Sequence, residues 1–296
     1  MKKIGLALGG GGAKGLAHIL MLEVFDELGI CPHRISGTSI GAVIGALYAS
    51  GTSGKQIREK VRSMIVSKEE FFRDALKRKD VFRWIKFLDV ELGRGGLFKG
   101  EKFMEYLYAA IGVSTFEELK IPLKIVAADF WKSGQVIFDS GELLPAVKAS
   151  MGLPGIFTPA VINDRILIDG GSVNPLPYDI LGDCDITVAV DVMGHMRSQG
   201  KHKMPNLFRV ISGTFDIMQN SIIAEKLKKN PPDIYIKPGI TGVDILEFYK
   251  AEEIYLQSAP AAYELRERLQ LLLESGHEKL FSLSGLYRSI FRGSGE

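Results

Sequence analysis

Ser39 stands between two glycines, Gly37 and Gly41, in the five-residue pattern Gly-Thr-Ser-Ile-Gly. The apolar segment before this pattern can form a strand, and the apolar segment after it can continue as a helix. A serine on such a strand-to-helix turn lies in a sharply bent backbone, which exposes its Oγ atom beyond the end of a sheet. The helix N-terminus adds positive potential at the same point. The pattern therefore predicts a nucleophilic serine of the kind used in acyl transfer.

A glycine-rich segment follows the first expected strand, at residues 4–8. Gly10, Gly11 and Gly12 belong to a run of glycines, Gly15 comes shortly after them, and an apolar segment of helical character follows. Glycines allow successive backbone N–H groups to point at one spot, and a helix N-terminus favours negative charge there. The segment is therefore a candidate anion site.

Three anions suit such a loop. The pyrophosphate of a dinucleotide would need a carboxylate at the end of the second strand, and none follows Ile35 there. A nucleoside triphosphate would need Gly-Lys followed by Ser or Thr, but Lys14 precedes Gly15. The third anion is the oxyanion of a tetrahedral acyl-transfer intermediate. Because Ser39 ends the next strand, the oxyanion matches best, and no cofactor is expected.

An acyl-transfer serine also needs a base. Residues 166–168 form a short apolar segment that delivers Asp169 into a turn made by Gly170 and Gly171. A carboxylate at a glycine turn is unhindered and lies at the edge of a sheet. Asp169 is therefore one candidate base.

Histidine is the alternative base, since an α/β-hydrolase triad has the chain order serine, acid, histidine. His195, His202 and His277 follow Ser39 in the chain. His195 comes after a plausible strand at residues 186–192. A histidine-dependent triad therefore stays open at this point.

The glycine loop at 10–15, the serine motif at 37–41 and the Asp-Gly-Gly motif at 169–171 together resemble the patatin-like phospholipase family of acyl hydrolases, in particular its bacterial branch. The three motifs occur in the order found in that family. Residues 149–159 are also similar to the segment that precedes the aspartate strand there. The resemblance covers residues 3–195.

This resemblance implies a serine–aspartate dyad without a catalytic histidine. Ser39 would be the nucleophile, Asp169 would take its proton, and the glycines at 10–12 would donate N–H groups to the oxyanion. Lys14 would place a cation near this loop. A free aspartate, with a pKa of about 3.9, is a weak base, so the dyad requires burial to raise the pKa of Asp169.

The implied fold is a three-layer α/β/α sandwich with a mostly parallel central sheet, and the alternating apolar segments agree with it. Residues 1–195 are expected to form a patatin-like acyl hydrolase core. Residues 196–296 are expected to form a C-terminal helical region packed on the same domain, with a boundary loop at 194–205. Besides the strand and helix around Ser39, strands are expected at residues 4–8, 123–128, 135–138, 165–168, 186–192 and 234–237, and helices at 16–28, 101–110, 207–228 and 250–274.

The composition is that of a globular protein, since 46% of the 296 residues are hydrophobic and 24% are charged. A net charge of +2, without a basic nucleic-acid-binding pattern, argues against a nucleic-acid partner. Cys31 and Cys184 have no metal-ligand spacing, and Asp183, Asp185 and Asp191 do not form a calcium loop, so no metal is expected. The oligomeric state stays open.

No apolar run approaches the roughly 18 residues of a membrane-spanning helix, and glycines interrupt the apolar N-terminal segment, which argues against a signal peptide. A cytoplasmic location is expected, with peripheral contact at the inner membrane surface. Residues 81–88 and 279–292 favour that contact, because each combines an apolar helical stripe with basic residues. Residues 81–88 are also a candidate lid.

These observations predict a hydrolase of lipid or fatty-acyl esters, of esterase, lysophospholipase or phospholipase A type, that forms an acyl-enzyme on Ser39. The alternative is a regulatory or adaptor protein that retains the fold while hydrolysis is incidental.

Overall fold

The computed structural model describes residues 2–63, 109–194, 204 and 207–290. The expected lid at 81–88, the expected boundary loop at 194–205 and the expected helix at 101–110 therefore lie wholly or largely outside the described residues. The same holds for His195 and His202.

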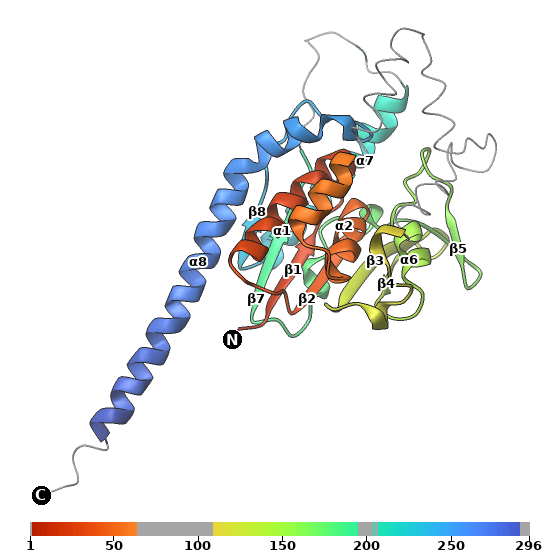
Figure 1. Ribbon diagram of the computed structural model, residues 1–296. Coiled ribbons are helices and arrows are strands. Elements are labelled where there is room, and N and C mark those ends of the chain that lie inside the picture. The colour runs from red at the N-terminus through yellow and green to blue at the C-terminus, as the bar shows by residue number, and fades with distance from the viewer. Residues whose placement is uncertain (1, 64–108, 195–203, 205–206, 291–296) are drawn as a thin grey trace, which may run out of the picture.

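An eight-stranded sheet forms the centre of the described structure (Figure 1). β1 pairs in parallel with β2 and β7, and further parallel pairs join β2 to β3 and β7 to β8. β4 and β6 pair antiparallel with β3, and β5 pairs antiparallel with β6. The predicted mostly parallel sheet is confirmed. Its strands are β1 (Ile4–Leu8), β2 (Arg34–Thr38), β3 (Leu123–Asp129), β4 (Gly134–Phe138), β5 (Ala160–Ile162), β6 (Arg165–Asp169), β7 (Ile186–Val190) and β8 (Ile234–Ile236).

β3 organises the region around Ser39, because two strands share one of its edges. The first part of β3 pairs with β2, and its last three residues pair with β6. β4 overlaps both of these stretches and so occupies the opposite edge. β2 and β6 therefore meet end to end, with Thr38 opposite Val126 and Asp169 opposite the next residue of β3, Ala127.

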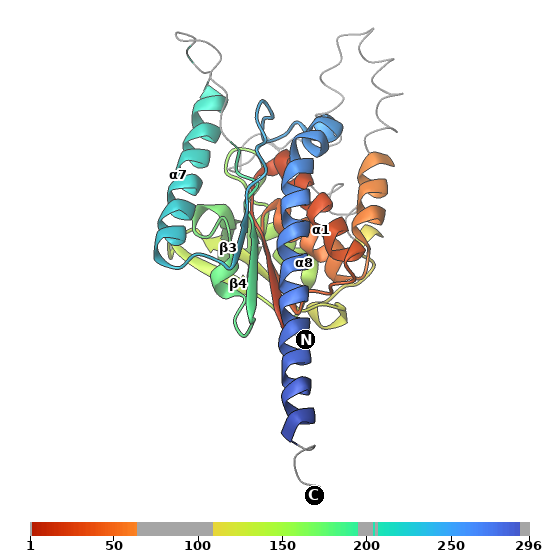
Figure 2. The ribbon, with the colours of Figure 1, turned by 90° about the vertical axis from the view of Figure 1, so that its left-hand side faces the viewer.

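Helices cover both faces of the sheet (Figure 2). Leu6 and Leu8 of β1 pack into the large core cluster with α1, α2 and α8. Ala7, which points the other way, packs in a second cluster with Ile223 of α7. The predicted three-layer arrangement is confirmed. The helices are α1 (Ala17–Glu27), α2 (Ile40–Ala49), α6 (Leu143–Ser150), α7 (Leu207–Lys229) and α8 (Ala251–Ile290).

α8 is longer than the sequence predicts. The sequence predicts a helix at residues 250–274, but the helix continues to Ile290 and runs past the sheet (Figure 1). Its first part is buried through residues such as Leu265, and it lies against α1. Because α8 covers α1 and β8 extends the sheet beside β7, we propose that residues 196–296 belong to the same domain as residues 1–195.

The sequence-based expectation lacks α6, β5 and the helical residues 54–63. β5 is three residues long, and α6 is eight residues long with a proline in its first turn. Apolar periodicity does not separate helix from strand over such short stretches.

Candidate active site

Ser39 lies on a tight turn between β2 and α2, as the serine motif predicts. Its φ of 54° is in the left-handed region, which residues other than glycine rarely adopt. A side-chain carbon on Gly41 would lie 2.1 Å from the carbonyl oxygen of Leu8, and one on Gly37 would lie 2.6 Å from the carbonyl oxygen of Gly41. Both positions therefore need glycine, because β1, β2 and α2 approach each other without room for a side chain.

Ser39 and Asp169 are in direct contact. Ser39 Oγ donates a hydrogen bond of 2.7 Å to Asp169 Oδ2, and the N–H of Gly171 donates one of 2.7 Å to Asp169 Oδ1. Asp169 is 2% exposed. Its burial raises the pKa of the carboxyl group to about 6, although the hydrogen bonds from Ser39 and Gly171 act in the opposite direction.

The antiparallel direction of β6 is what brings Asp169 to Ser39. β6 returns from beyond the carboxyl end of β3 and stops one β3 residue short of the point where β2 ends. Gly170 permits this close approach, since a side-chain carbon there would lie 2.3 Å from the carbonyl oxygen of Val126. The sequence singles out Ser39 and Asp169 but does not predict this arrangement of strands.

Ser150, the last residue of α6, also stabilises the turn at Ser39. The N–H of Ser39 donates a 2.8 Å hydrogen bond to Ser150 Oγ, which in turn donates one of 2.6 Å to the carbonyl oxygen of Val126. Ser150 is fully buried. It belongs to the 149–159 segment that the family resemblance includes, but the sequence alone does not single it out.

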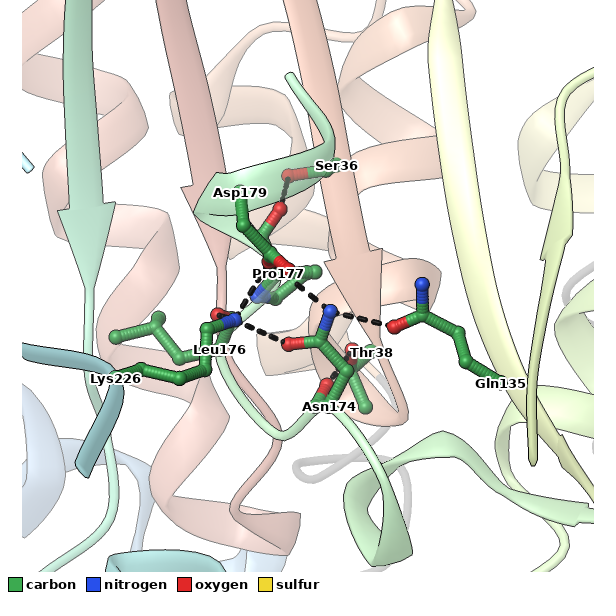
Figure 3. Close-up of polar contacts among 8 residues, drawn as sticks. All are labelled: Ser36, Thr38, Gln135, Asn174, Leu176, Pro177, Asp179 and Lys226. Carbon is green, nitrogen blue, oxygen red and sulfur yellow. Dashed lines mark hydrogen bonds and ion pairs between the residues drawn. The ribbon is translucent and has the colours of Figure 1, made fainter. Parts of the chain in front are cut away.

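The segment after the Asp-Gly-Gly turn runs back along β2 and is bound to it (Figure 3). Ser36 Oγ donates a 2.8 Å hydrogen bond to the carbonyl oxygen of Pro177, and Thr38 Oγ1 donates one of 2.8 Å to that of Asn174. Both hydroxyl groups are on the same face of β2, at alternate positions. Polar residues at alternate positions in an otherwise apolar strand were the signal that could have revealed this contact.

Of the three glycines that are expected to bind the oxyanion, Gly10 already has a backbone partner for its N–H group. The N–H of Gly10 donates a 2.9 Å hydrogen bond to the carbonyl oxygen of Pro175, in the segment that returns along β2. Gly10 is thus not a free donor in this structure, whereas the prediction is that Gly10, Gly11 and Gly12 all bind the oxyanion. Among the described residues, no acceptor engages the N–H groups of Gly11 and Gly12.

His18 holds the start of this loop, a role that the sequence did not reveal. Its Nε2 atom lies 2.8 Å from the carbonyl oxygen of Gly9, and the side chain is fully buried. Burial lowers the pKa of His18 to about 4, so the ring is neutral at physiological pH and donates through Nε2.

Lys14 and Gly15 connect the loop to two helices. Lys14 is buried, and its Nζ atom lies 3.8 Å from a carboxylate oxygen of Asp216 on α7. A side-chain carbon on Gly15 would lie 2.2 Å from Ile40 Cγ2, so only glycine lets the first residue of α2 pack here. The cation expected near the loop is therefore present, paired with an acid that the sequence did not link to it.

The described residues contain no group of three histidine, cysteine or acidic side chains that could hold a metal ion. No helix in the described part of the chain has the length and apolar character needed to cross a membrane. The side chain of His277, like His195 and His202, lies outside what the structure describes. Asp169 is the carboxylate that the structure places beside Ser39.

Several known proteins are similar to this chain in sequence. An uncharacterised NTE family protein of Mycobacterium bovis is 31% identical over 227 residues, which cover 73% of this chain and 58% of that protein. Neuropathy target esterase sws of Drosophila melanogaster is 34% identical over 194 residues, 64% of this chain and 13% of that protein. Lysophospholipase NTE1 of Kluyveromyces lactis is 27% identical over 291 residues, 90% of this chain and 19% of that protein. The chain thus spans little more than half the length of the first of these relatives and far less of the others.

Among solved structures, VipD from Legionella pneumophila aligns with a TM-score of 0.44 and 16% identity, over 89% of this chain and 67% of that one. A family model described as patatin-like phospholipase matches residues 6–181. That segment contains the glycine loop, Ser39 and Asp169 and makes up more than half of the sequence. The chain belongs to the patatin-like phospholipase family.

Proposed function

We propose that the protein is a serine hydrolase that cleaves acyl esters of lipids through Ser39, Asp169 and an acyl-enzyme intermediate. One observation carries this proposal: the 2.7 Å hydrogen bond from Ser39 Oγ to a carboxylate that is 2% exposed. A general base must lie within hydrogen-bond reach of the proton that it removes, and Asp169 already does so.

In acylation, Ser39 Oγ attacks the ester carbonyl carbon while Asp169 Oδ2 accepts the serine proton. The tetrahedral intermediate then collapses, and the leaving alcohol takes the proton from Asp169 as its C–O bond breaks. A pKa of about 6 makes Asp169 a stronger base than free aspartate and leaves it ionised at neutral pH. Water then hydrolyses the acyl-enzyme by the same proton route.

The oxyanion would be held by the N–H groups of Gly11 and Gly12, together with the positive N-terminus of α2. Donors that are fixed in place before the reaction stabilise the developing charge without reorganisation, and each one contributes about 10²- to 10³-fold to the rate. Lys14 adds a buried positive charge beside this loop, partly balanced by Asp216.

Two observations support a lipid ester as substrate. The names of the Kluyveromyces and Drosophila relatives include lysophospholipase and esterase. In addition, Phe130 and Trp131 follow β3 at the end of the sheet where Ser39 lies, with 50% and 75% exposure. Exposed aromatic side chains suit the interface between lipid and water, so we propose that this turn makes peripheral contact with a lipid surface.

The alternative of a regulatory or adaptor protein has less support. The left-handed backbone at Ser39 and the buried carboxylate of Asp169 both destabilise the fold. Neither feature is needed by a protein that only binds a partner, whereas acyl transfer uses both.

Hydrolysis is expected to rise with pH and to reach half of its plateau near pH 6, because Asp169 must be ionised to accept the proton of Ser39. The measurement is kcat/KM for a p-nitrophenyl ester over about pH 4 to 8, which reports the ionisation of the free enzyme. Titration of His18 does not coincide with the midpoint near pH 6, since burial lowers its pKa to about 4. A midpoint near pH 7 would instead favour a histidine base.

Covalent labelling with a fluorophosphonate tests the proposed nucleophile directly. We expect one adduct by intact mass, mapped by peptide digestion to Ser39, and faster labelling when anionic vesicles are present. An adduct on a different serine, or a folded protein that stays unlabelled with and without vesicles, would contradict the proposal.

A further inference from the structure

Gln219 lies beside the dyad, although it is 180 positions away from Ser39 in the chain and outside the segment matched by the family model. It is on the inward face of α7 and is 4% exposed. No motif predicts it, and the mechanism above does not use it.

Distances place the amide of Gln219 between the glycine loop and the Asp-Gly-Gly turn. A side-chain carbon on Gly171 would lie 2.9 Å from Gln219 Nε2 and 3.0 Å from Asp169 Oδ1. One on Gly10 would lie 3.7 Å from Gln219 Oε1 and 3.5 Å from Ser39 Cβ. The amide nitrogen therefore faces the aspartate turn, and the amide oxygen faces the loop and the serine.

Polar contacts on both sides of Gln219 along α7 hold the helix in this position. Before Gln219, Asp216 lies 3.8 Å from the Nζ atom of Lys14. After it, Lys226 Nζ donates hydrogen bonds of 2.7 Å to Asn174 Oδ1 and 2.6 Å to Asp179 Oδ1 (Figure 3). The position of Gln219 over the dyad is thus held from both sides along the helix.

The amide oxygen of Gln219 is buried, and no donor among the described residues reaches it. A buried acceptor without a donor destabilises a folded protein, and such groups are rare in native structures. A molecule that enters the site with an O–H group to spare would satisfy this oxygen.

We propose that Gln219 Oε1 accepts a hydrogen bond from the water that hydrolyses the acyl-enzyme, and so orients that water for attack. The inference rests on the proposed function, because it requires an acyl group on Ser39. The water would then have two acceptors, Asp169 for one hydrogen and Gln219 Oε1 for the other.

In this step the water oxygen attacks the carbonyl carbon of acyl-Ser39, and one of its protons moves to Asp169 Oδ2. The other hydrogen stays on the water oxygen and is donated to Gln219 Oε1. As the intermediate collapses, the bond between the carbonyl carbon and Ser39 Oγ breaks, and Asp169 returns its proton to Oγ. The products are a carboxylic acid and free serine, so the atoms and protons balance.

Methanol provides a sharp test, because it has only one O–H group. When methanol attacks the acyl-enzyme, its single proton goes to Asp169, and nothing remains to donate to Gln219. Loss of Gln219 should therefore slow attack by water more than attack by methanol.

The experiment uses p-nitrophenyl butyrate with a fixed concentration of methanol, and measures methyl butyrate against butyrate. In the nearly isosteric variant Gln219→Met we expect the ratio of ester to acid to rise about five- to tenfold, the factor for one lost hydrogen bond. The matched control Gln257→Met makes the same change on α8, and its ratio should equal that of the wild type. The ratio does not depend on which step limits the overall rate.

A second variant separates hydrogen bonding from packing. Gln219→Glu keeps an acceptor oxygen, so its ratio should stay near the wild-type value, whereas a second carboxylate beside Asp169 should move the pH midpoint upward. Gln219→Met should melt at or above the wild-type temperature, since it removes an acceptor that lacks a donor.

The outcomes are distinct. A loss of both products with an unchanged ratio in Gln219→Met would reduce Gln219 to a packing residue and overturn the inference. No change in rate or ratio would overturn it as well. If the wild type forms neither product, the proposed function itself fails.

Discussion

Asp169→Asn is expected to lower kcat/KM for ester hydrolysis by about 10²- to 10⁴-fold, the range supplied by a positioned general base. Asparagine can still accept the hydrogen bond from the N–H of Gly171 and can donate to Ser39 Oγ, so the geometry around the serine is retained. It cannot take the serine proton. Chromogenic ester hydrolysis measures the loss, and fluorophosphonate labelling checks that it arises at the nucleophilic step.

The thermal stability of Asp169→Asn distinguishes loss of the general base from loss of the fold. The pKa of Asp169 is raised by burial, so the folded protein holds this proton more tightly than the unfolded chain does. The stability that this group contributes is therefore complete below about pH 4 and is lost as the pH rises through 6. Near pH 8, Asp169→Asn should thus melt no lower than the wild type.

Asp164→Asn is the matched control, because it makes the same change at an exposed turn residue between β5 and β6. Its hydrolysis should equal that of the wild type. If Asp169→Asn retained near-normal turnover, the serine–aspartate dyad would be wrong and the histidine alternative would have to be tested.

The second large effect is expected at Gly41, where alanine should destabilise the protein by about 1–3 kcal/mol or more and abolish hydrolysis. Its side-chain carbon would lie 2.1 Å from the carbonyl oxygen of Leu8 and 2.8 Å from that of Gly9. Those oxygens belong to backbone, so α2 would have to move away from β1, and overpacking of rigid atoms costs at least about 1–3 kcal/mol. Urea unfolding measures the change.

Gly45→Ala provides the control on the same helix, with the opposite sign. The three atoms nearest to a side-chain carbon there all belong to side chains, the closest being Ile35 Cγ2 at 3.3 Å. Replacing a glycine inside a helix by alanine removes about 0.5–1 kcal/mol of entropic cost. Gly45→Ala should therefore leave stability unchanged or raised and keep hydrolysis intact. Equal destabilisation by the two substitutions would show that the contact with Leu8 is not the cause.

The sequence identifies Ser39 and Asp169, which the structure brings into contact, because each of them lies in a local motif. Ser39 and Asp169 are each marked by glycines that the backbone needs for close approach, and such needs are visible in a few adjacent residues. The helix after Ser39 can also be recognised, because α2 is apolar along its whole length. β2 has Ile35 as its one large apolar residue and is identified through the serine motif in which it ends.

The remainder of the site depends on contacts between distant segments, which no local pattern records. Gln219, Asp216 and His18 are ordinary residues in helices until the fold brings them to the glycine loop. The hydrogen bond from the Gly10 N–H is also non-local, because its acceptor is the carbonyl oxygen of Pro175, in the loop segment that returns along β2. Sequence reasoning thus identifies residues that need special backbone geometry and misses those that act only through tertiary position.

The shared edge of β3 has a consequence for how the site tolerates thermal motion. Ser39 and Asp169 are positioned by two successive residues of one strand, Val126 and Ala127, rather than by strands on opposite sides of the sheet. Because one strand sets both positions, we expect bending or twisting of the sheet to change the gap between Ser39 Oγ and Asp169 Oδ2 little. The distance that proton transfer requires should then be less sensitive to collective motion of the sheet than it would be if two separate strands set it.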